Sequence, residues 1–137
     1  MNMKKTVLLI EDRSSHSDAF IVVAKALDCD IEVVNCVESL RRVIGSHPFG
    51  GWDLIVMDCQ MPERPAGQPT TQYMEEMYEL IWPKVQKGAL WIWSVLSDVE
   101  DVARFLEEHN LNQYTIAKGQ TPERLAKSLK QALCLEG

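Results

Sequence analysis

The sequence predicts an α/β fold in which helices cover both faces of a five-stranded parallel sheet. Five short apolar segments alternate along the chain with five segments that carry apolar residues at helical spacing. The apolar segments are nearly continuous, which is typical of strands that are buried on both sides. Because a helix between two strands allows them to run parallel, this alternation predicts a doubly wound sheet.

The first unit begins with a strand at 4–11, where two lysines lead into the apolar run TVLLI. The helix that follows carries an apolar face that includes Phe20 and Val23, and Ser14 or Ser15 is the expected N-cap. The second strand is the β-branched segment IEVVNCV at 31–37, and a weaker helical pattern, SLRRVI, follows it. These two units precede the Pro/Gly segment SHPFGG.

The third strand is DLIVMD at 53–58, and the proline-rich loop after it leads to a helix that Pro83 is expected to end or kink at Trp82. The inner face of that helix is marked by Met74, Met77, Tyr78 and Ile81. ALWIWSV at 89–95 is the fourth strand, and a capping box that starts at Ser97 opens the fourth helix. YTIA at 114–117 is the fifth strand, with Thr121 as N-cap and Pro122 as first residue of the last helix.

Length and composition indicate one domain over residues 1–137. The formal net charge is -6, which argues against direct binding to nucleic acid or to an anionic membrane surface. No apolar run approaches the roughly 20 residues that span a bilayer, so we expect a cytoplasmic protein. The four cysteines form no CxxC pair and are expected to be reduced, mostly buried thiols.

Five polar residues follow or end strands at the edge where the carboxyl ends of a parallel sheet meet: Glu11, Asp12, Asp58, Ser94 and Lys118. Ligands of doubly wound proteins bind at this edge. Taken singly, each residue has an ordinary structural explanation, such as a surface ion pair or a charge beside a helix terminus. Their coincidence at one edge predicts a functional site.

The charges of this group indicate its chemistry. Three carboxylates and one lysine leave a formal charge of about -2, which a divalent cation would offset. Oxygen ligands favour Mg²⁺, which is commonly held by one or two carboxylates together with phosphate oxygens. A carboxylate in such a site can act as nucleophile and form an aspartyl phosphate.

The segments VLLIED, DLIVMDCQMP, WSV and IAKG resemble the four signature blocks of the receiver domain of bacterial response regulators. The resemblance spans nearly the whole chain and implies a flavodoxin-like fold of strand order 2-1-3-4-5. It also implies a role for each residue of the site. Asp58 is the phosphoacceptor, Ser94 the switch hydroxyl and Lys118 the phosphate-binding lysine. The implied Mg²⁺ ligands are Glu11, Asp12, Asp58 and the backbone carbonyl of Gln60.

The resemblance further implies that a sensor histidine kinase or a histidine phosphotransfer protein donates the phosphoryl group. The output is expected through contacts with a downstream protein or a second copy of the chain. Such a protein is a signalling phosphoacceptor that assists its own phosphoryl transfer and dephosphorylation, and is not an enzyme acting on other substrates. The chain is either a stand-alone receiver or a part of a larger protein.

Four features depart from the family pattern. Gly119 stands where a proline is usual, and Thr115 occupies the position that often holds a switching aromatic residue, with Tyr114 just before it. Val95 follows the switch hydroxyl, and its branched side chain is expected to shield an acyl phosphate and slow dephosphorylation. The segment 63–72 is longer than usual and is expected to form a recognition surface beside the site.

Three other functions compete with this one. The first is a protein-interaction module of the same fold that is never phosphorylated. The second is a phosphatase of the haloacid dehalogenase type, which requires an acid two residues after the nucleophile, where this chain has Gln60. The third is flavin binding, which the acidic turn EDRSSH disfavours. The four tryptophans are expected to pack in the core, and the three histidines show no metal-binding spacing.

Overall fold

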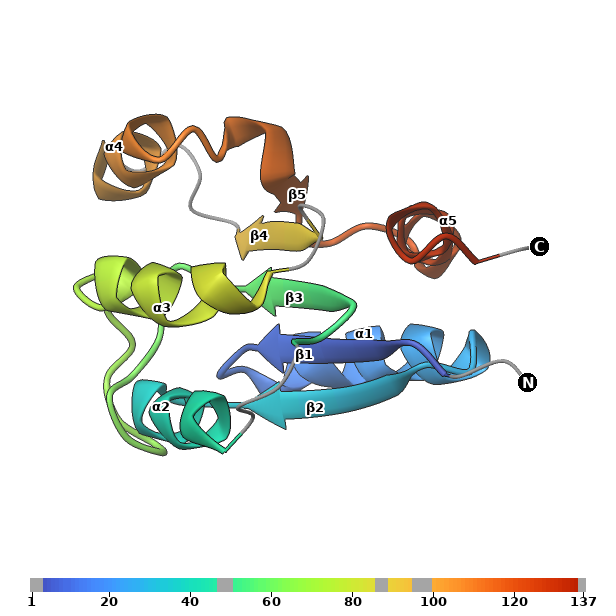
Figure 1. Cartoon of the computed structure of the whole chain (residues 1–137), viewed down its shortest axis with the longest axis horizontal. Coiled ribbons are helices and arrows are strands. Elements are labelled where there is room, and N and C mark those ends of the chain that lie inside the picture. The colour runs from blue at the N-terminus through green and yellow to red at the C-terminus, as the bar shows by residue number, and fades with distance from the viewer. Residues whose placement is uncertain (1–3, 47–50, 86–88, 95–99, 136–137) are drawn as a thin grey trace.

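The computed structural model describes residues 4–46, 51–85, 89–94 and 100–135. Within these residues, five strands form one parallel sheet in the order β2-β1-β3-β4-β5 (Figure 1). The strands are β1 (Thr6–Ile10), β2 (Asp30–Val34), β3 (Leu54–Met57), β4 (Leu90–Ser94) and β5 (Thr115–Ala117). The predicted fold class and strand order are therefore confirmed.

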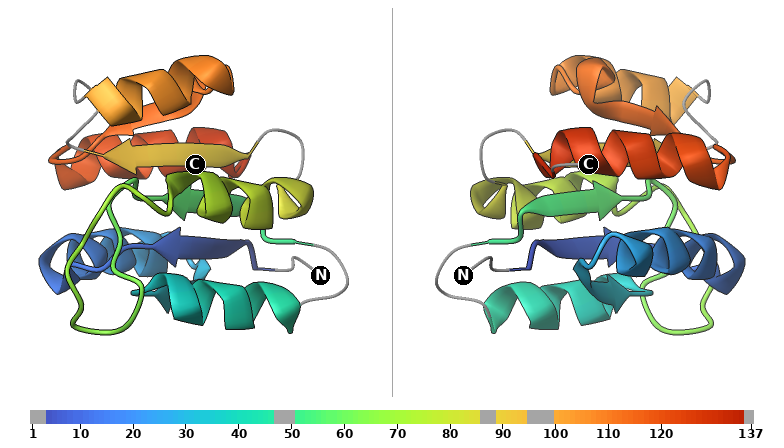
Figure 2. Two further views of the ribbon diagram at one scale, coloured as in Figure 1. Left: turned by 90° about the vertical axis from the view of Figure 1, so that its left-hand side faces the viewer. Right: turned by 90° about the vertical axis from the view of Figure 1, so that its right-hand side faces the viewer.

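Helices cover both faces of the sheet, as Figure 2 shows from opposite sides. In the described part of the chain they are α1 (Ser14–Ala26), α2 (Val37–Gly45), α3 (Met74–Ile81), α4 (Glu100–Glu108) and α5 (Pro122–Ala132). Two short 3₁₀ helices, η1 (Trp82–Lys84) and η2 (Asn112–Tyr114), precede β4 and β5. Helices α2, α3 and α4 pack on one face, and α1 and α5 on the other.

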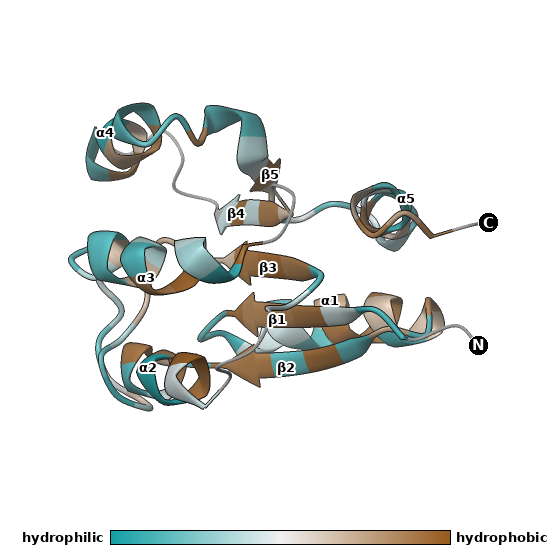
Figure 3. Cartoon of the chain, in the orientation of Figure 1, coloured by the Kyte–Doolittle hydropathy of each residue, from teal (hydrophilic) through white to brown (hydrophobic). Residues whose placement is uncertain are grey.

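The central strands are buried on both sides, which explains their continuous apolar sequence (Figure 3). In β1, Leu8 and Ile10 belong to the core beneath α2, α3 and α4, whereas Val7 and Leu9 belong to the core beneath α1 and α5. This alternation follows from the two-residue period of a strand. Two cores therefore fix the central strands, and with them the residues that follow at their carboxyl ends.

The helix starts test the predicted caps. Thr121 caps α5 as predicted, with its hydroxyl accepting the Arg124 N–H at 3.3 Å and with Pro122 as the first helical residue. The prediction for α1 is wrong, because the N-cap is Arg13 and both serines lie inside the helix. Arg13 takes the extended backbone conformation of a cap, but its side chain makes no capping hydrogen bond. The capping box at Ser97 lies outside the described residues.

Most of the tryptophans and cysteines are buried, as predicted. Three of the four tryptophans are buried, while Trp82 in η1 is 43% exposed. Helix α3 ends at Ile81 and continues as η1 through Pro83, close to the predicted end. Three cysteines are buried and Cys134 is exposed, and none of these four described residues forms a disulfide. No helix among the described residues is long and apolar enough to cross a membrane.

Candidate functional site

The carboxyl ends of β1 and β3 bring three acidic residues together. Ile10 and Met57 are paired in the sheet, so Glu11 and Asp58 are the next residues of two neighbouring strands. The Asp58 N–H donates to the Ile10 carbonyl at 3.0 Å, which fixes the backbone at this point. One carboxylate oxygen each from Glu11, Asp12 and Asp58 lies within 4.8 Å of the others. The register of the sheet therefore brings together the three acids that were predicted at its carboxyl edge.

Lys118 lies across β4 from these acids, and its side chain extends to two of them. It follows β5, yet its Nζ donates to Asp58 Oδ2 at 3.0 Å and to Glu11 Oε1. The side chain is only 4% exposed, and its Nζ lies 5.1 Å from the centroid of the Trp93 ring. The ammonium group is thus buried between two carboxylates and beside an aromatic ring.

The acids carry more charge than the lysine can balance. Glu11 is 1% exposed and Asp58 is 6% exposed, so both are shielded from water. Burial, and then the neighbouring Glu11, raise the pKa of Asp12 above its ordinary value. Three carboxylates against one ammonium group favour the binding of a cation at this point.

The donor atoms fit Mg²⁺. Carboxylate oxygens are the hard ligands that Mg²⁺ prefers, and the three acids offer one oxygen each within a short distance. The Gln60 N–H donates to Asp58 Oδ1 at 3.3 Å, which places the start of the β3–α3 loop beside the site. The role of the Gln60 backbone carbonyl as a metal ligand stays a prediction.

Ser94 is the last residue of β4 and pairs with Ala117, immediately before Lys118. Its backbone therefore ends at the same edge as Asp58 and Lys118. The side chain of Ser94 and the whole of Val95 lie outside what the structure describes, so their predicted roles stay predictions.

Gly119 has a φ of +82°, a conformation that glycine adopts easily and that other residues disfavour. Proline, whose ring fixes φ near -65°, cannot take this backbone conformation. The departure from the family pattern at this position is therefore accompanied by a different backbone after Lys118.

A small pocket of about 30 Å³ opens beside Asp58. The described residues that line it are Asp12, Arg13, His16, Asp58, Gln60, Pro69 and Lys118. His16, to which the sequence assigned no role, has its Nδ1 3.6 Å from Glu11 Oε1. The spacing of the histidines gave no sign of this, and only the position of α1 relative to the acids reveals it.

A second group of possible metal ligands, Glu75, Glu108 and His109, lies on the surface of α3 and α4. The His109 Nε2 is 2.8 Å from a Glu75 carboxylate oxygen, so these two residues form an ion pair when the histidine is protonated. We assign this group no role. His47 lies outside the described residues.

The fold and the acidic pocket define a doubly wound α/β protein with a charged site at the carboxyl edge of its sheet. The solved structures that share this fold include receiver domains. The signal receiver domain of a Vibrio parahaemolyticus protein matches with a TM-score of 0.67 at 21% identity, covering 96% of this chain and 92% of that one. The non-phosphorylated HemR receiver domain from Leptospira biflexa matches with a TM-score of 0.67 at 16% identity, covering 98% of each chain.

A third similar structure is the receiver domain of a sensor histidine kinase from Pseudomonas aeruginosa, which contains a magnesium ion in its active-site cleft. Its TM-score is 0.64 at 16% identity, covering 96% of this chain and 99% of that one. No protein-family model matches the sequence, and no curated protein matches it either. At these identities the similarity establishes the fold, and the chain has the fold of response regulator receiver domains.

Proposed function

We propose that the chain is a phosphoacceptor of two-component signalling, in which Asp58 receives a phosphoryl group in a Mg²⁺-dependent reaction. The observation that carries the proposal is the convergence of Glu11, Asp12 and Lys118 on Asp58 at one pocket. A structural ion pair needs only one acid and one base, whereas this site holds two acids in excess. The excess is suited to a cation and a transferred phosphoryl group.

The expected donor is a phosphohistidine on a sensor histidine kinase or a histidine phosphotransfer protein. An Asp58 carboxylate oxygen forms a bond to phosphorus while the phosphorus–nitrogen bond breaks and its electron pair returns to the imidazole. The acids would hold Mg²⁺, which supplies neutralisation of the charge on the transferring group. Lys118, already within hydrogen-bonding distance of Asp58, is placed to donate to a phosphoryl oxygen.

Transfer adds a charge of about -1.5 to -2 to the pocket. Lys118 is then drawn from its present bonds with Glu11 and Asp58 towards the phosphoryl oxygens, and the β4–β5 edge that carries it changes with it. We infer that the signal passes through contact with a downstream protein or a second copy of the chain. On this proposal the chain is a cytoplasmic signalling protein, not an enzyme acting on other substrates.

Incubation with acetyl phosphate and Mg²⁺, followed by intact-mass spectrometry, tests the proposal. We expect a mass gain of one phosphoryl group, which is lost in Asp58→Asn and retained in Asp18→Asn, a matched change at an exposed position on α1. Removal of Mg²⁺ by chelation is expected to abolish the gain. If the unaltered chain gains no mass, the result favours the alternative of a non-phosphorylated interaction module.

A further inference from the structure

The loop between β3 and α3 is folded into a hairpin, which we define as residues 61–70 and call the β3–α3 hairpin. Met61 and Thr70 exchange two backbone hydrogen bonds, of 3.0 Å and 3.2 Å. At its tip the Gly67 N–H donates to the Arg64 carbonyl at 3.0 Å, and Ala66 has a φ of +63°. The segment that the sequence marked as unusually long is therefore an ordered element.

The hairpin is docked on the start of α2, as its course beside that helix in Figure 1 shows. The N–H groups of Val37 and Glu38 donate to the carbonyls of Pro62 and Glu63 at 2.9 Å and 3.0 Å. These N–H groups belong to the first turn of α2, where no partner exists within the helix. The hairpin thus supplies acceptors that α2 needs.

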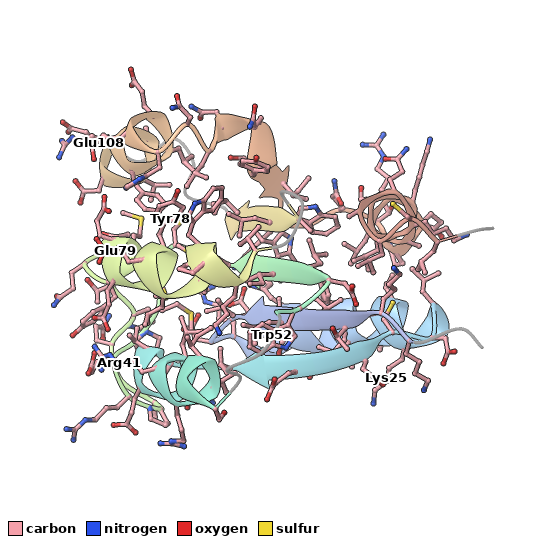
Figure 4. All side chains as sticks on the ribbon, in the orientation of Figure 1. Lys25, Arg41, Trp52, Tyr78, Glu79 and Glu108 are labelled. Atoms are coloured by element: carbon pink, nitrogen blue, oxygen red, sulfur yellow. The ribbon has the colours of Figure 1, made fainter. Side chains whose placement is uncertain are left out.

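Arg41 fastens this arrangement from the side of α2 (Figure 4). Its guanidinium donates to both carboxylate oxygens of Glu63, at 2.6 Å and 3.2 Å, and to both of Glu76 on α3. The Arg41 guanidinium holds the pKa of both carboxyl groups below their ordinary value. One side chain therefore ties α2, the hairpin and α3 together, in a forked geometry that lysine cannot reproduce.

The other arm of the hairpin reaches the site. Pro69 lines the pocket beside Asp58 and Lys118. The pocket is small, about 30 Å³, and partly open to solvent, so Pro69 is placed to restrict what reaches Asp58 through it.

The walls differ in how firmly they are held. Asp12 and Asp58 follow the two central strands, and Lys118 is buried between two carboxylates. Beyond its buried first residue, Met61, the hairpin is held by two backbone hydrogen bonds to α2, the partly exposed Arg41 network and an ion pair of Arg64 with Glu38. Exposed ion pairs are individually weak, so the hairpin is held less firmly than Asp12, Asp58 and Lys118.

We propose that Arg41 is a positioning residue that restricts access to Asp58 by holding the β3–α3 hairpin, and Pro69 with it, against the pocket. The inference rests on the proposed function and adds a regulator to it. With the hairpin clamped, both the phosphoryl donor and the water that hydrolyses the acyl phosphate enter slowly. In hydrolysis the water oxygen bonds to phosphorus, the bond to the Asp58 oxygen breaks with its electron pair returning to the carboxylate, and inorganic phosphate and a proton leave.

The test compares Arg41→Ala and Arg41→Lys with Arg104→Ala, a matched control whose arginine forms an ion pair with Glu100 on its own helix, α4. Hydrogen exchange on the unphosphorylated protein is measured first. We expect faster exchange of the Val37 and Glu38 amides in Arg41→Ala, a smaller change in Arg41→Lys, and none in the control. Unchanged exchange in Arg41→Ala would show that Arg41 does not hold the hairpin and would overturn the proposal.

The rates of mass gain from acetyl phosphate and of mass loss after its removal are measured next. We expect both to rise roughly threefold to tenfold in Arg41→Ala, less in Arg41→Lys, and not at all in Arg104→Ala. Wild-type rates in Arg41→Ala, with the hairpin amides exchanging faster, would refute the control of access while leaving phosphorylation of Asp58 intact. If the unaltered chain gains no phosphoryl group, the proposed function fails first and this inference fails with it.

Discussion

Replacement of Lys118 by methionine is the most direct test of how the site is balanced. The substitution keeps a flexible side chain of similar length and removes only the ammonium group. Glu11 and Asp58 are then left as buried carboxylates without their cation, since the lysine side chain is 4% exposed and those of its partners 0% and 8%. Loss of one partner from a buried ion pair costs about 3–5 kcal/mol of the free energy of unfolding.

The expected loss has two signatures beyond its size. It should shrink as the pH falls, because protonation of the uncompensated carboxylates removes their repulsion. It should also be partly reversed by Mg²⁺, which stabilises the folded state by about 2.7 kcal/mol when its free concentration is one hundred times the dissociation constant. Both signatures follow from charge, and a packing defect would show neither.

Chemical denaturation of Lys118→Met and wild type, with and without Mg²⁺ and from acid to neutral pH, provides the measurement. Lys127→Met on α5 is the control, because Lys127 is exposed, and we expect a change within about 0.5 kcal/mol. If Lys118→Met proves as stable as wild type at neutral pH, or if its loss is independent of both pH and Mg²⁺, the account of the site as a charge-balanced cluster is wrong.

Three further outcomes are expected. The raised pKa of Asp12 means that this group favours the folded state most at acid pH and loses that contribution as the pH rises through the folded pKa. With Mg²⁺ removed by a chelator, Asp12→Asn should therefore become more stable relative to wild type as the pH rises towards neutral. Denaturation curves showing the reverse trend would contradict this. Gly119→Ala should destabilise the fold by about 1 kcal/mol because φ is +82°, as thermal unfolding can check. Val95→Ala should speed the decay of phosphorylated Asp58, and an unchanged decay rate in the mass assay would show that Val95 does not shield the acyl phosphate.

Much of the fold could be read from the sequence because its determinants are local. Segments such as LIVM in β3 are apolar throughout, which is typical of a strand covered on both faces. The position of Asp58 directly after such a strand placed it at the carboxyl edge. Since parallel strands end at a common edge, Glu11 and Lys118 were expected beside it, and the structure brings the three together.

Other features depend on contacts between distant segments and left no local pattern. His16 faces the pocket because α1 begins at Ser14, one residue after the cap at Arg13. Pro69 arrives there through the pairing of Met61 with Thr70. The conformational propensities of the residues show neither which element a hairpin packs against nor the direction in which a loop folds back.

The start of the fifth strand also differs from the prediction. Tyr114, expected in the fifth strand, ends η2 instead and packs against the core beneath α2, α3 and α4. Thr115 begins β5, and its hydroxyl donates to the Leu111 carbonyl at 3.4 Å. The 3₁₀ helix η2 includes Tyr114, whose N–H donates to the Leu111 carbonyl, so the strand begins one residue later than predicted.

The reach of Lys118 also bears on how the protein is made. Its two carboxylate partners lie 107 and 60 residues earlier in the chain. During synthesis the acids of β1 and β3 emerge before the lysine, and the entropy of closing such long loops opposes early formation of these contacts. Until β5 joins the edge of the sheet, the nascent domain carries its acids without their cation. The last β-α unit therefore completes the site and the sheet in the same step.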